Sequence, residues 1–379
     1  MTTLRVIVDQ IVAPVPGGIG TYCQQLTREL ITTAPQGADV AAIIASATDE
    51  DVQRLGLALP GLAHVHKSVL PRRELELAWQ YGVSWLAGGG MIHSSSLLAP
   101  LGAHDRVNDP GHQVVVTVHD TVAWSHPESY SPRWVTWHRA MLDRAHRFAD
   151  AVVTPTHAVA HQLNEILDFG ERVRVIGGAV SSTLALPEDA DASAARLALP
   201  ERYLLTVGAP ERHRGVDALI HALSRPELGD IALLVVSQDG WQGIDVPAVA
   251  AEAGLAETRV RSLGPLSDAD LAVVLDRAAV FVMPSLAEGF GLPMIEAFRM
   301  STPVVHSDDP ALVEVSAGSG LTVERADALG YPARLADAIA RVLADQALAA
   351  RLGTLGFDRS RAYSWRDSAE KVWQLHADL

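Results

Sequence analysis

Cysteine and lysine are scarce in this sequence. Its 379 residues include one cysteine, Cys23, which excludes an internal disulfide, and no group of cysteines and histidines has the spacing of a zinc site. Only two of the 30 basic residues are lysines, Lys67 and Lys371, and neither lies in a motif that would hold pyridoxal phosphate. The pattern G-x-x-x-x-G-K-[ST] is absent, which excludes the common ATP-binding loop. We therefore expect no metal and no cofactor.

Long apolar runs and an excess of positive charge are missing as well. No run reaches the roughly 18 apolar residues of a membrane span. The start MTTLRVIVDQ leads into a strand without the basic and then apolar segments of a signal peptide. The formal net charge is −15, whereas surfaces that bind nucleic acid are normally basic. We expect a cytoplasmic protein that does not bind nucleic acid.

Short β-branched runs alternate with helix-length segments along the whole chain, which is typical of parallel sheets covered by helices. The runs are LRVIV (4–8), VAAIIA (40–45), VVVTV (114–118), AVVTP (151–155), VRVI (173–176), YLLTV (203–207), IALLVV (231–236), AVFVMP (279–284) and TPVV (302–305). The pattern predicts an α/β fold with two Rossmann-like, doubly wound parallel-sheet domains.

The segment 184–201 interrupts this alternation with proline, aspartate, serine and alanine. We expect an N-terminal domain over 1–183, a linker over 184–201 and a C-terminal domain over 202–361. A last helix over 362–379 is expected to pack back on the N-terminal domain. Ligands of such sheets bind beyond the carboxyl ends of the strands, so the expected site is an interdomain cleft.

The stretch EGFGLPMIEA (288–297) contains two glutamates eight positions apart. We expect Glu288 on a loop after a strand and Glu296 in the first turns of a helix that begins near Pro293. Backbone N–H groups of residues 289–291 and of the helix start would bind an anion such as a diphosphate. The glutamates could then accept hydrogen bonds from diols on either side of it. The alternatives are an ordinary strand–loop–helix connection and a glycosidase carboxylate pair, which would have to flank a bond from opposite sides.

The longer segment PSLAEGFGLPMIEA, preceded by LGPLSDADLAVVL and followed by STPVVHSD, resembles the sugar-nucleotide motif of retaining glycosyltransferases of GT-B fold, family 4 (group 1). The resemblance implies that Glu288 contacts the donor sugar and that Glu296 contacts the ribose. It also implies an N-terminal domain on the acceptor side. The backbone groups that it places near the sugar and phosphates belong to Gly289, Phe290, Gly291 and Leu292.

The resemblance also implies roles for two motifs of the N-terminal half. PGGIGTYCQQL (16–26) is typical of a flexible turn between a strand and a helix, and the resemblance makes Gly17 and Gly18 contacts of the donor. VVVTVHDTVAW (114–124) leads an apolar strand into His119 and Asp120. A histidine at this place is by itself a packed or solvated residue, but the resemblance implies that His119 faces the donor sugar and is catalytic.

A basic turn, ERHRG, follows the strand-like LLTV in the C-terminal half. Arg212 and Arg214 could neutralise the charge that develops on a diphosphate as the sugar–phosphate bond breaks. The alternative is a solvated turn. The family pattern is closer to G-x-x-x-P-R-K-G, so the turn is a residue short and Arg214 replaces a lysine. The resemblance assigns both arginines to the donor and makes Arg214, with His119 and Glu288, catalytic.

The sequence as a whole thus predicts a retaining, metal-independent hexosyltransferase. The motifs favour mannose from GDP-mannose, with UDP- or dTDP-sugars as alternatives, and a glycan or lipid-linked acceptor. A sugar-nucleotide epimerase and a non-catalytic sugar-nucleotide-binding subunit remain open as alternatives. The segment RWVTWHRAMLDRAHRF (133–148) has aromatic residues at helical spacing among arginines. It predicts either a helix packed on the first sheet or a peripheral contact with the inner face of a membrane.

Overall fold

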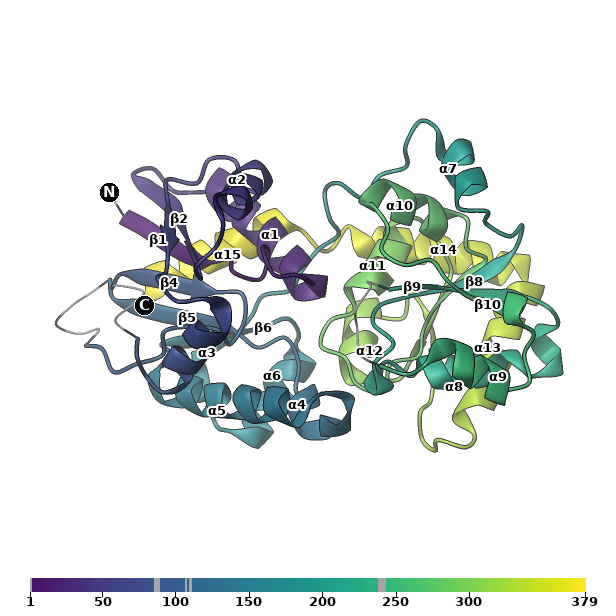
Figure 1. Ribbon diagram of the computed structural model, residues 1–379. Helices are drawn as coiled ribbons and strands as arrows, with labels where there is room; N and C mark the ends of the chain where they lie inside the picture. Colours follow the sequence, from purple (N-terminus) through teal and green to yellow (C-terminus); the bar gives the residue numbers. More distant parts are fainter. Residues whose placement is uncertain (1, 85–88, 106–107, 109–110, 238–242) are drawn as a thin grey trace. The chain divides into compact units, whose positions relative to one another are not determined.

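A computed structural model describes residues 2–84, 89–105, 108, 111–237 and 243–379 (Figure 1). The chain forms two compact units. The first unit comprises Met1–Trp124, Ser131–Gly178 and Ser364–Leu379, and the second comprises Ser125–Tyr130 and Ala179–Tyr363. Each unit is a parallel sheet covered by helices, as the sequence predicts.

The sheet of the first unit has seven parallel strands in the order β3-β2-β1-β4-β5-β6-β7. Strands β2 and β3 are added on one side of β1, and the chain then crosses to the other side of β1, where β4 to β7 follow in order. This reversal between β1 and β4 creates a crevice at the carboxyl ends of these strands. The strands are β1 (Thr2–Ile7), β2 (Ala38–Ile44), β3 (Val65–Lys67), β4 (Met91–Ser94), β5 (Gln113–Thr117), β6 (Ala151–Thr154) and β7 (Val173–Val175).

The helices around this sheet include one from the far end of the sequence. Helix α15 (Trp365–Asp378) belongs to the first unit, where Ser368 Oγ donates to the Gly177 carbonyl at 2.7 Å and Trp373 Nε1 donates to the Leu30 carbonyl at 3.1 Å. The others are α1 (Gly17–Thr32), α2 (Asp49–Ala58), α3 (Arg72–Gln80), α5 (Pro132–Phe148) and α6 (His157–Ile166), while the short α4 (Val122–Ser125) ends at the boundary between the units.

The sheet of the second unit has six parallel strands in the order β10-β9-β8-β11-β12-β13. Its reversal falls between β8 and β11, whose pairing aligns Val280 with Leu204 and Phe281 with Leu205. The crevice therefore lies at the carboxyl ends of these two strands. The strands are β8 (Tyr203–Val207), β9 (Ala232–Val236), β10 (Val260–Ser262), β11 (Val280–Met283), β12 (Val304–Ser307) and β13 (Leu321–Val323).

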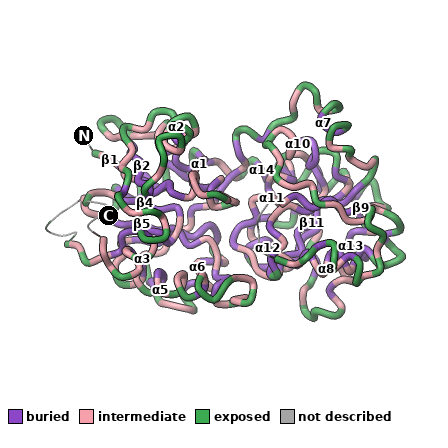
Figure 2. The backbone as a smooth tube through the Cα atoms, in the orientation of Figure 1, coloured by how far each residue is buried: buried purple, intermediate pink, exposed green. Residues whose placement is uncertain are grey.

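Helices on both faces bury this sheet, and Figure 2 shows its strands among the most deeply buried parts of the chain. Strands covered on both faces need apolar residues at every position, which explains runs such as YLLTV and VFVM. The helices are α7 (Ala190–Arg196), α8 (Val216–Leu223), α9 (Val246–Glu252), α10 (Asp268–Asp276), α11 (Leu292–Arg299), α12 (Pro310–Ser316), α13 (Tyr331–Ala344) and α14 (Gln346–Ser360).

The segment 184–201, which we expect to be a linker, packs as part of the second unit. Leu184 is buried in its core, and residues 190–196 form α7, which lies against α10. The unit boundary falls between Gly178 and Ala179, a few residues before the segment begins.

Candidate functional site

The charged motifs of the second unit follow the two strands at which its sheet reverses. Residues Arg212–Arg214 form a short 3₁₀ turn after β8, and Glu288 lies in the loop after β11. Because the carboxyl ends of neighbouring parallel strands meet at one edge of a sheet, segments that are far apart in sequence come together here.

Arg214 and Glu288 form an ion pair across this edge. Arg214 Nη1 donates to Glu288 Oε2, which also accepts a hydrogen bond from Ser285 Oγ at 3.3 Å. The Gly289 N–H lies 3.3 Å from Glu288 Oε1, and Arg214 Nε lies 3.9 Å from Glu211 Oε2. The Glu288 side chain is only 11% exposed. A carboxylate has about four acceptor positions, so Oε1 retains capacity for a ligand hydroxyl.

Arg212 has a different environment from Arg214. Arg212 is exposed, and within the described part of the chain its guanidinium forms no hydrogen bond or ion pair. The structure therefore brings Arg214, but not Arg212, into contact with Glu288. Between them, His213 is buried, and its pKa is lowered to about 3 by burial and by the positive charge of Arg214. A neutral His213 leaves Arg214 as the cation that faces Glu288.

Glu296 lies on α11, one to two turns beyond Glu288. As the sequence predicts, Pro293 stands in the first turn of this helix, and Gly291 precedes it with a φ of 83°. A Cβ at position 291 would come within 2.6 Å of Leu312 Cδ2, so glycine is required here for both space and conformation.

The Glu296 carboxyl group is half-buried, and no described residue forms a hydrogen bond or ion pair with it. Burial, together with the negative charge of Asp268, raises its pKa to about 8. Asp268 is itself held by the hydroxyls of Ser181 and Thr183, which both donate to its Oδ2. An unpartnered acceptor of this kind is suited to a ligand with hydroxyl groups.

The N–H groups that open α11 are also free. Among the described residues, none accepts a hydrogen bond from the backbone N–H of Phe290, Gly291 or Leu292. The first amides of a helix lack intrahelical partners and carry its positive dipole end, so they can bind an anion. The segment between the two glutamates thus has the properties that the sequence predicts for a diphosphate site.

Sequence reasoning missed two acidic residues beside this site. Asp309 follows β12 and accepts hydrogen bonds from the N–H groups of Ala311 and Leu312 at 2.9 and 3.4 Å. Burial and the negative charge of Glu288 raise its pKa, and nearby Arg325 lowers it, with a net value of about 6. Its neighbour Asp308 accepts from Arg325 Nε at 2.6 Å. The signal was available, because HSDD directly follows the strand-like TPVV.

In the first unit, His119 lies just beyond the end of β5. Its Nε2 is 2.7 Å from the Ser95 carbonyl, and a carbonyl only accepts, so Nε2 carries the proton and Nδ1 is an acceptor. Burial lowers its pKa, although the bond to Ser95 opposes this effect. The ring of Tyr22 meets it edge-on with 4.8 Å between centroids. His119 is therefore a fixed, uncharged hydrogen-bond acceptor.

Gly17 and Gly18 differ from the sequence prediction of a flexible turn. They begin helix α1, and the turn lies before them. Gly17 has a φ of 59°, and the space beside Gly18 is open to 4 Å. At Gly20, by contrast, a Cβ would lie 2.4 Å from Pro16 Cβ. Gly20 is thus required for packing, whereas Gly18 leaves the helix start accessible.

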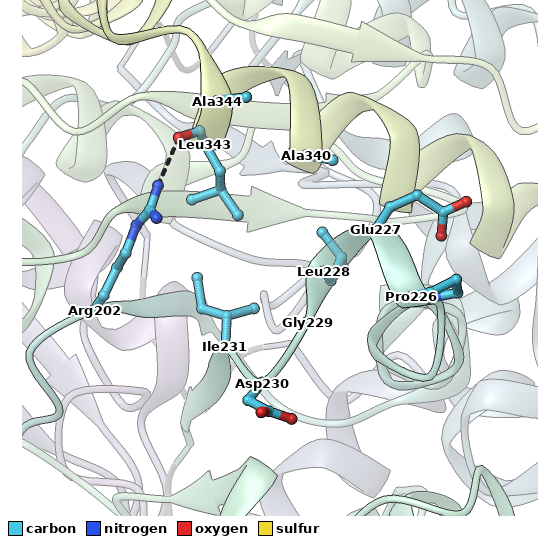
Figure 3. Close-up of a pocket in the computed structure, with 10 residues that line it drawn as sticks. All are labelled: Arg202, Pro226, Glu227, Leu228, Gly229, Asp230, Ile231, Ala340, Leu343 and Ala344. Atoms are coloured by element: carbon cyan, nitrogen blue, oxygen red, sulfur yellow. Dashed lines mark hydrogen bonds between the residues drawn. The ribbon is translucent and has the colours of Figure 1, made fainter.

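A surface hollow of the second unit lies elsewhere. It has a volume of about 560 Å³, and Figure 3 shows the Arg202 side chain reaching the Leu343 carbonyl at its rim, where Nη2 donates at 2.6 Å. Arg202 precedes β8, and Ile231 precedes β9. The hollow therefore lies at the amino ends of the strands, opposite the edge that bears Glu288.

The described residues contain neither a metal-binding cluster nor a membrane-spanning helix. Among them, no group of three or more histidine, cysteine, aspartate or glutamate side chains is arranged to hold a metal ion. In the same part of the chain, no helix combines the length and apolarity needed to cross a membrane.

Comparison with known families agrees with this geometry. Residues 201–345 match the family described as "Glycosyl transferases group 1", and residues 16–183 match "Glycosyltransferase Family 4". The two parallel-sheet Rossmann-like units have the GT-B fold of glycosyltransferases, which solved relatives share. The chain belongs to glycosyltransferase family 4, group 1.

Curated relatives include mannosyltransferases. The O-antigen chain mannosyltransferase RfbU of Salmonella typhimurium is 25% identical over 334 residues, covering 86% of this chain and 91% of the relative. The serotype-specific mannosyltransferase WbdA of Escherichia coli is 26% identical over 303 residues, covering 76% of this chain. The match spans only 35% of the length of WbdA.

Solved structures share the fold at lower identity. Sucrose-phosphate synthase from Thermosynechococcus elongatus superposes with a TM-score of 0.77 at 24% identity, over 100% of this chain and 99% of that one. HepE from Anabaena, in complex with UDP-glucose, gives a TM-score of 0.73 at 18% identity over the full length of both chains.

Proposed function

We propose that this chain is a retaining, metal-independent hexosyltransferase that moves a sugar from a nucleoside diphosphate to an acceptor hydroxyl. The observation that carries the proposal is the segment 288–296. It combines a carboxylate fixed by Arg214, free N–H groups at the start of α11 and the unpartnered Glu296 carboxyl group.

Each of these groups has a role in the proposed chemistry. Glu296 accepts hydrogen bonds from the ribose hydroxyls, and the amides at the start of α11 bind the diphosphate. Glu288 Oε1 accepts from a sugar hydroxyl. Arg214 donates to Glu288, and its positive charge stabilises the leaving β-phosphate.

The proposed step is a displacement on one face of the sugar. The bond between the anomeric carbon and the phosphate oxygen breaks, and the nucleoside diphosphate leaves with the electron pair. The acceptor oxygen bonds to the anomeric carbon on the same face, and its proton passes to the departing phosphate oxygen. His119 Nδ1 accepts a hydrogen bond from a sugar hydroxyl and so contributes orientation without charge. Gly17 and Gly18 leave room for the donor at the start of α1.

The donor that we favour is GDP-mannose, because the full-length relative RfbU is a mannosyltransferase. A UDP-sugar is the second candidate, because a structural neighbour was solved with UDP-glucose. A glycan or lipid-linked acceptor fits the O-antigen context of that same relative.

We propose a peripheral position at the inner face of a membrane on the exposed arginines of helix α5 alone. Its exposed residues include Arg133 and Arg147, whereas Met141 and Leu142 face the core. Trp137 is partly buried and donates from Nε1 to the Glu76 carbonyl at 3.4 Å, so the aromatic residues pack within the unit. Sedimentation with anionic vesicles tests this position. The sedimented fraction should fall when Arg133 and Arg147 are changed to glutamine. An unchanged fraction would contradict the membrane position.

The experiment that tests the function is incubation with GDP-mannose, UDP-glucose and a dTDP-sugar, with and without a hydroxyl acceptor. Transfer predicts release of one nucleoside diphosphate and a product whose anomeric proton shows retained configuration by NMR. Sugar interconversion without an acceptor would indicate an epimerase. Tight binding without turnover would indicate a non-catalytic subunit.

A further inference from the structure

The loop that precedes Glu288 is held by side chains from three other elements. Three consecutive backbone carbonyls, those of Pro284, Ser285 and Leu286, each accept a hydrogen bond from a side chain distant in sequence. Tyr331 Oη donates to Pro284 at 3.0 Å, Ser307 Oγ donates to Ser285 at 2.6 Å, and Arg325 Nη1 donates to Leu286. We call Tyr331, Ser307 and Arg325 the carbonyl clamp.

Two members of the clamp are buried, and the third, Arg325, is partly exposed and fixed by carboxylates. Tyr331 begins α13 and is 1% exposed, and Ser307 ends β12 and is fully buried. Arg325 follows β13 and is fixed in turn by Asp308, through Nε at 2.6 Å, and by Asp309, through Nη1 at 3.4 Å. Burial raises the pKa of Tyr331, so its hydroxyl keeps the proton that it donates.

The N–H side of the same loop is held as well. The Leu286 N–H donates to the His213 carbonyl at 2.7 Å, and the Ala287 N–H approaches the same oxygen at 3.4 Å. His213 directly precedes Arg214. The clamp therefore acts on both members of the Arg214–Glu288 pair, because displacement of residues 284–287 would move Glu288 and the turn that carries Arg214 together.

We propose that Tyr331, Ser307 and Arg325 are positioning residues that fix Glu288 and Arg214 in the geometry required for transfer. Tyr331 and Arg325 lie outside the stretches that resemble the donor motif, and Ser307 lies in STPVVHSD, which follows that motif. The physical reason is that a buried carbonyl without a donor costs free energy, so the loop has one favourable path while all three donors are present. Its link to turnover rests on the proposed function, but its effect on the loop does not.

The test compares the double variant Tyr331→Phe, Ser307→Ala with the matched double variant Tyr203→Phe, Ser360→Ala. The control also removes one tyrosine hydroxyl and one serine hydroxyl from the second unit, but at other positions. There Tyr203 Oη donates to the Val274 carbonyl at 2.7 Å and Ser360 Oγ donates to the Phe357 carbonyl at 2.7 Å, both outside the loop.

The first readout is amide hydrogen exchange over 285–292 without any ligand. We expect it to accelerate about tenfold or more in the clamp variant and to stay at the wild-type rate in the control, because local opening sets the exchange rate. Equal exchange in the two variants would overturn the proposal.

The second readout is the split between affinity and turnover. The clamp variant should lose about tenfold in kcat while its Kd for whichever of GDP, UDP, dTDP or ADP binds the wild type stays within twofold. A kcat equal to that of the control would overturn the catalytic part of the proposal. If the wild type binds none of these nucleotides, the proposed function fails, whereas the exchange measurement still decides the role of the clamp.

A second pair of variants covers the case in which the double variant does not fold. Arg325→Gln removes one donor from a partly exposed position. It is matched by Arg259→Gln, because Arg259 donates to the carbonyls of Ile231 and Leu223 at 2.9 and 3.1 Å. Faster exchange over 285–292 in Arg325→Gln alone supports the clamp, and the same exchange in both variants contradicts it.

Discussion

The two units carry different kinds of side chain at the carboxyl ends of their strands. In the second unit, the segments after β8 and β11 carry Arg214 and Glu288, which form an ion pair, and the loop before Glu288 is held through its carbonyl and N–H groups. In the first unit, the end of β5 carries His119, an uncharged ring with one hydrogen bond to a carbonyl.

This difference indicates a division of labour. The Arg214 cation suits a ligand part that gains negative charge during the reaction, such as a leaving diphosphate. Hydrogen-bond acceptors such as His119 and Glu288 suit a sugar hydroxyl, whose charge does not change. Variants of Arg214 and Glu296 should therefore affect leaving-group stabilisation or nucleotide affinity, whereas variants of His119 and Glu288 should affect turnover alone.

Loss of the paired cation should have the largest effect. We expect Arg214→Ala to lower kcat by about 10²- to 10³-fold, the range for removing one group that stabilises transition-state charge. Arg212→Ala is the control, since Arg212 is exposed and outside the Glu288 pair, and it should retain most of the activity. Steady-state kinetics with the donor that the protein uses measures both. A kcat for Arg214→Ala within twofold of wild type would show that the pair is structural.

Loss of the neutral acceptor should come next. His119→Ala should lower kcat by about 10- to 100-fold, which corresponds to one lost hydrogen bond to the reacting sugar. Calorimetric titration should find its Kd for the nucleoside diphosphate unchanged. Because the pKa of His119 is lowered, kcat of the wild type should show no His119 titration between pH 7 and 8. Weaker nucleotide binding in this variant would contradict the division of labour.

The two glutamates should separate affinity from turnover. Glu296→Ala should weaken nucleoside diphosphate binding by about tenfold, as expected for lost hydrogen bonds to a charged acceptor. Glu288→Gln should leave that affinity nearly unchanged and should lower kcat. Calorimetry and initial rates on the same preparations measure both effects. The reverse pattern would exchange the two assignments.

The smallest effect should be a dependence of affinity on pH. The pKa of Glu296 is raised from 4.5 to about 8, so its carboxyl group is mostly protonated at pH 7 without a ligand. Two ribose hydroxyls are best accepted by the ionised form, so affinity should rise severalfold from pH 6.5 to 9.

Glu296→Gln controls for ionisation of the nucleotide itself and should remove this rise. Without a ligand, the stability of the protein should change with pH in the opposite direction to the affinity. Between pH 4.5 and 8 the unfolded state loses this proton before the folded state does, so the free energy of unfolding falls as pH rises and Glu296→Gln should lessen that fall. Equal slopes in wild type and variant, for both affinity and stability, would exclude Glu296 as the titrating group.

Much of the fold was predictable, because strands buried on both faces must be apolar at every position. The strands β3, β10 and β13 were missed because each has only three residues, whereas β7, which is as short, is followed by the apolar Ile176 and was recognised in VRVI. The strand β4 (Met91–Ser94) is likewise absent from the predicted runs. The polar His93 conceals it: its ring is buried against His376 of α15, with 3.4 Å between nitrogens.

For the site, too, the sequence predicts local features but not contacts between distant segments. The positions of Glu288, Pro293 and Glu296 relative to the strand and helix follow from local sequence and agree with the structure. The pairing of Arg214 with Glu288 depends on the strand order β8-β11, which brings together residues 74 positions apart. The carbonyl clamp acts on backbone oxygens, which every residue has, so no sequence pattern marks it.

The central claim is that the segment 288–296 holds a nucleoside diphosphate, and its most direct test is calorimetric titration of wild type and Glu296→Ala with GDP, UDP, dTDP and ADP. The account predicts saturable binding of one of these nucleotides by the wild type and binding about tenfold weaker in the variant. Equal affinity in the two proteins, or no binding of any of the four by folded wild-type protein, would contradict it.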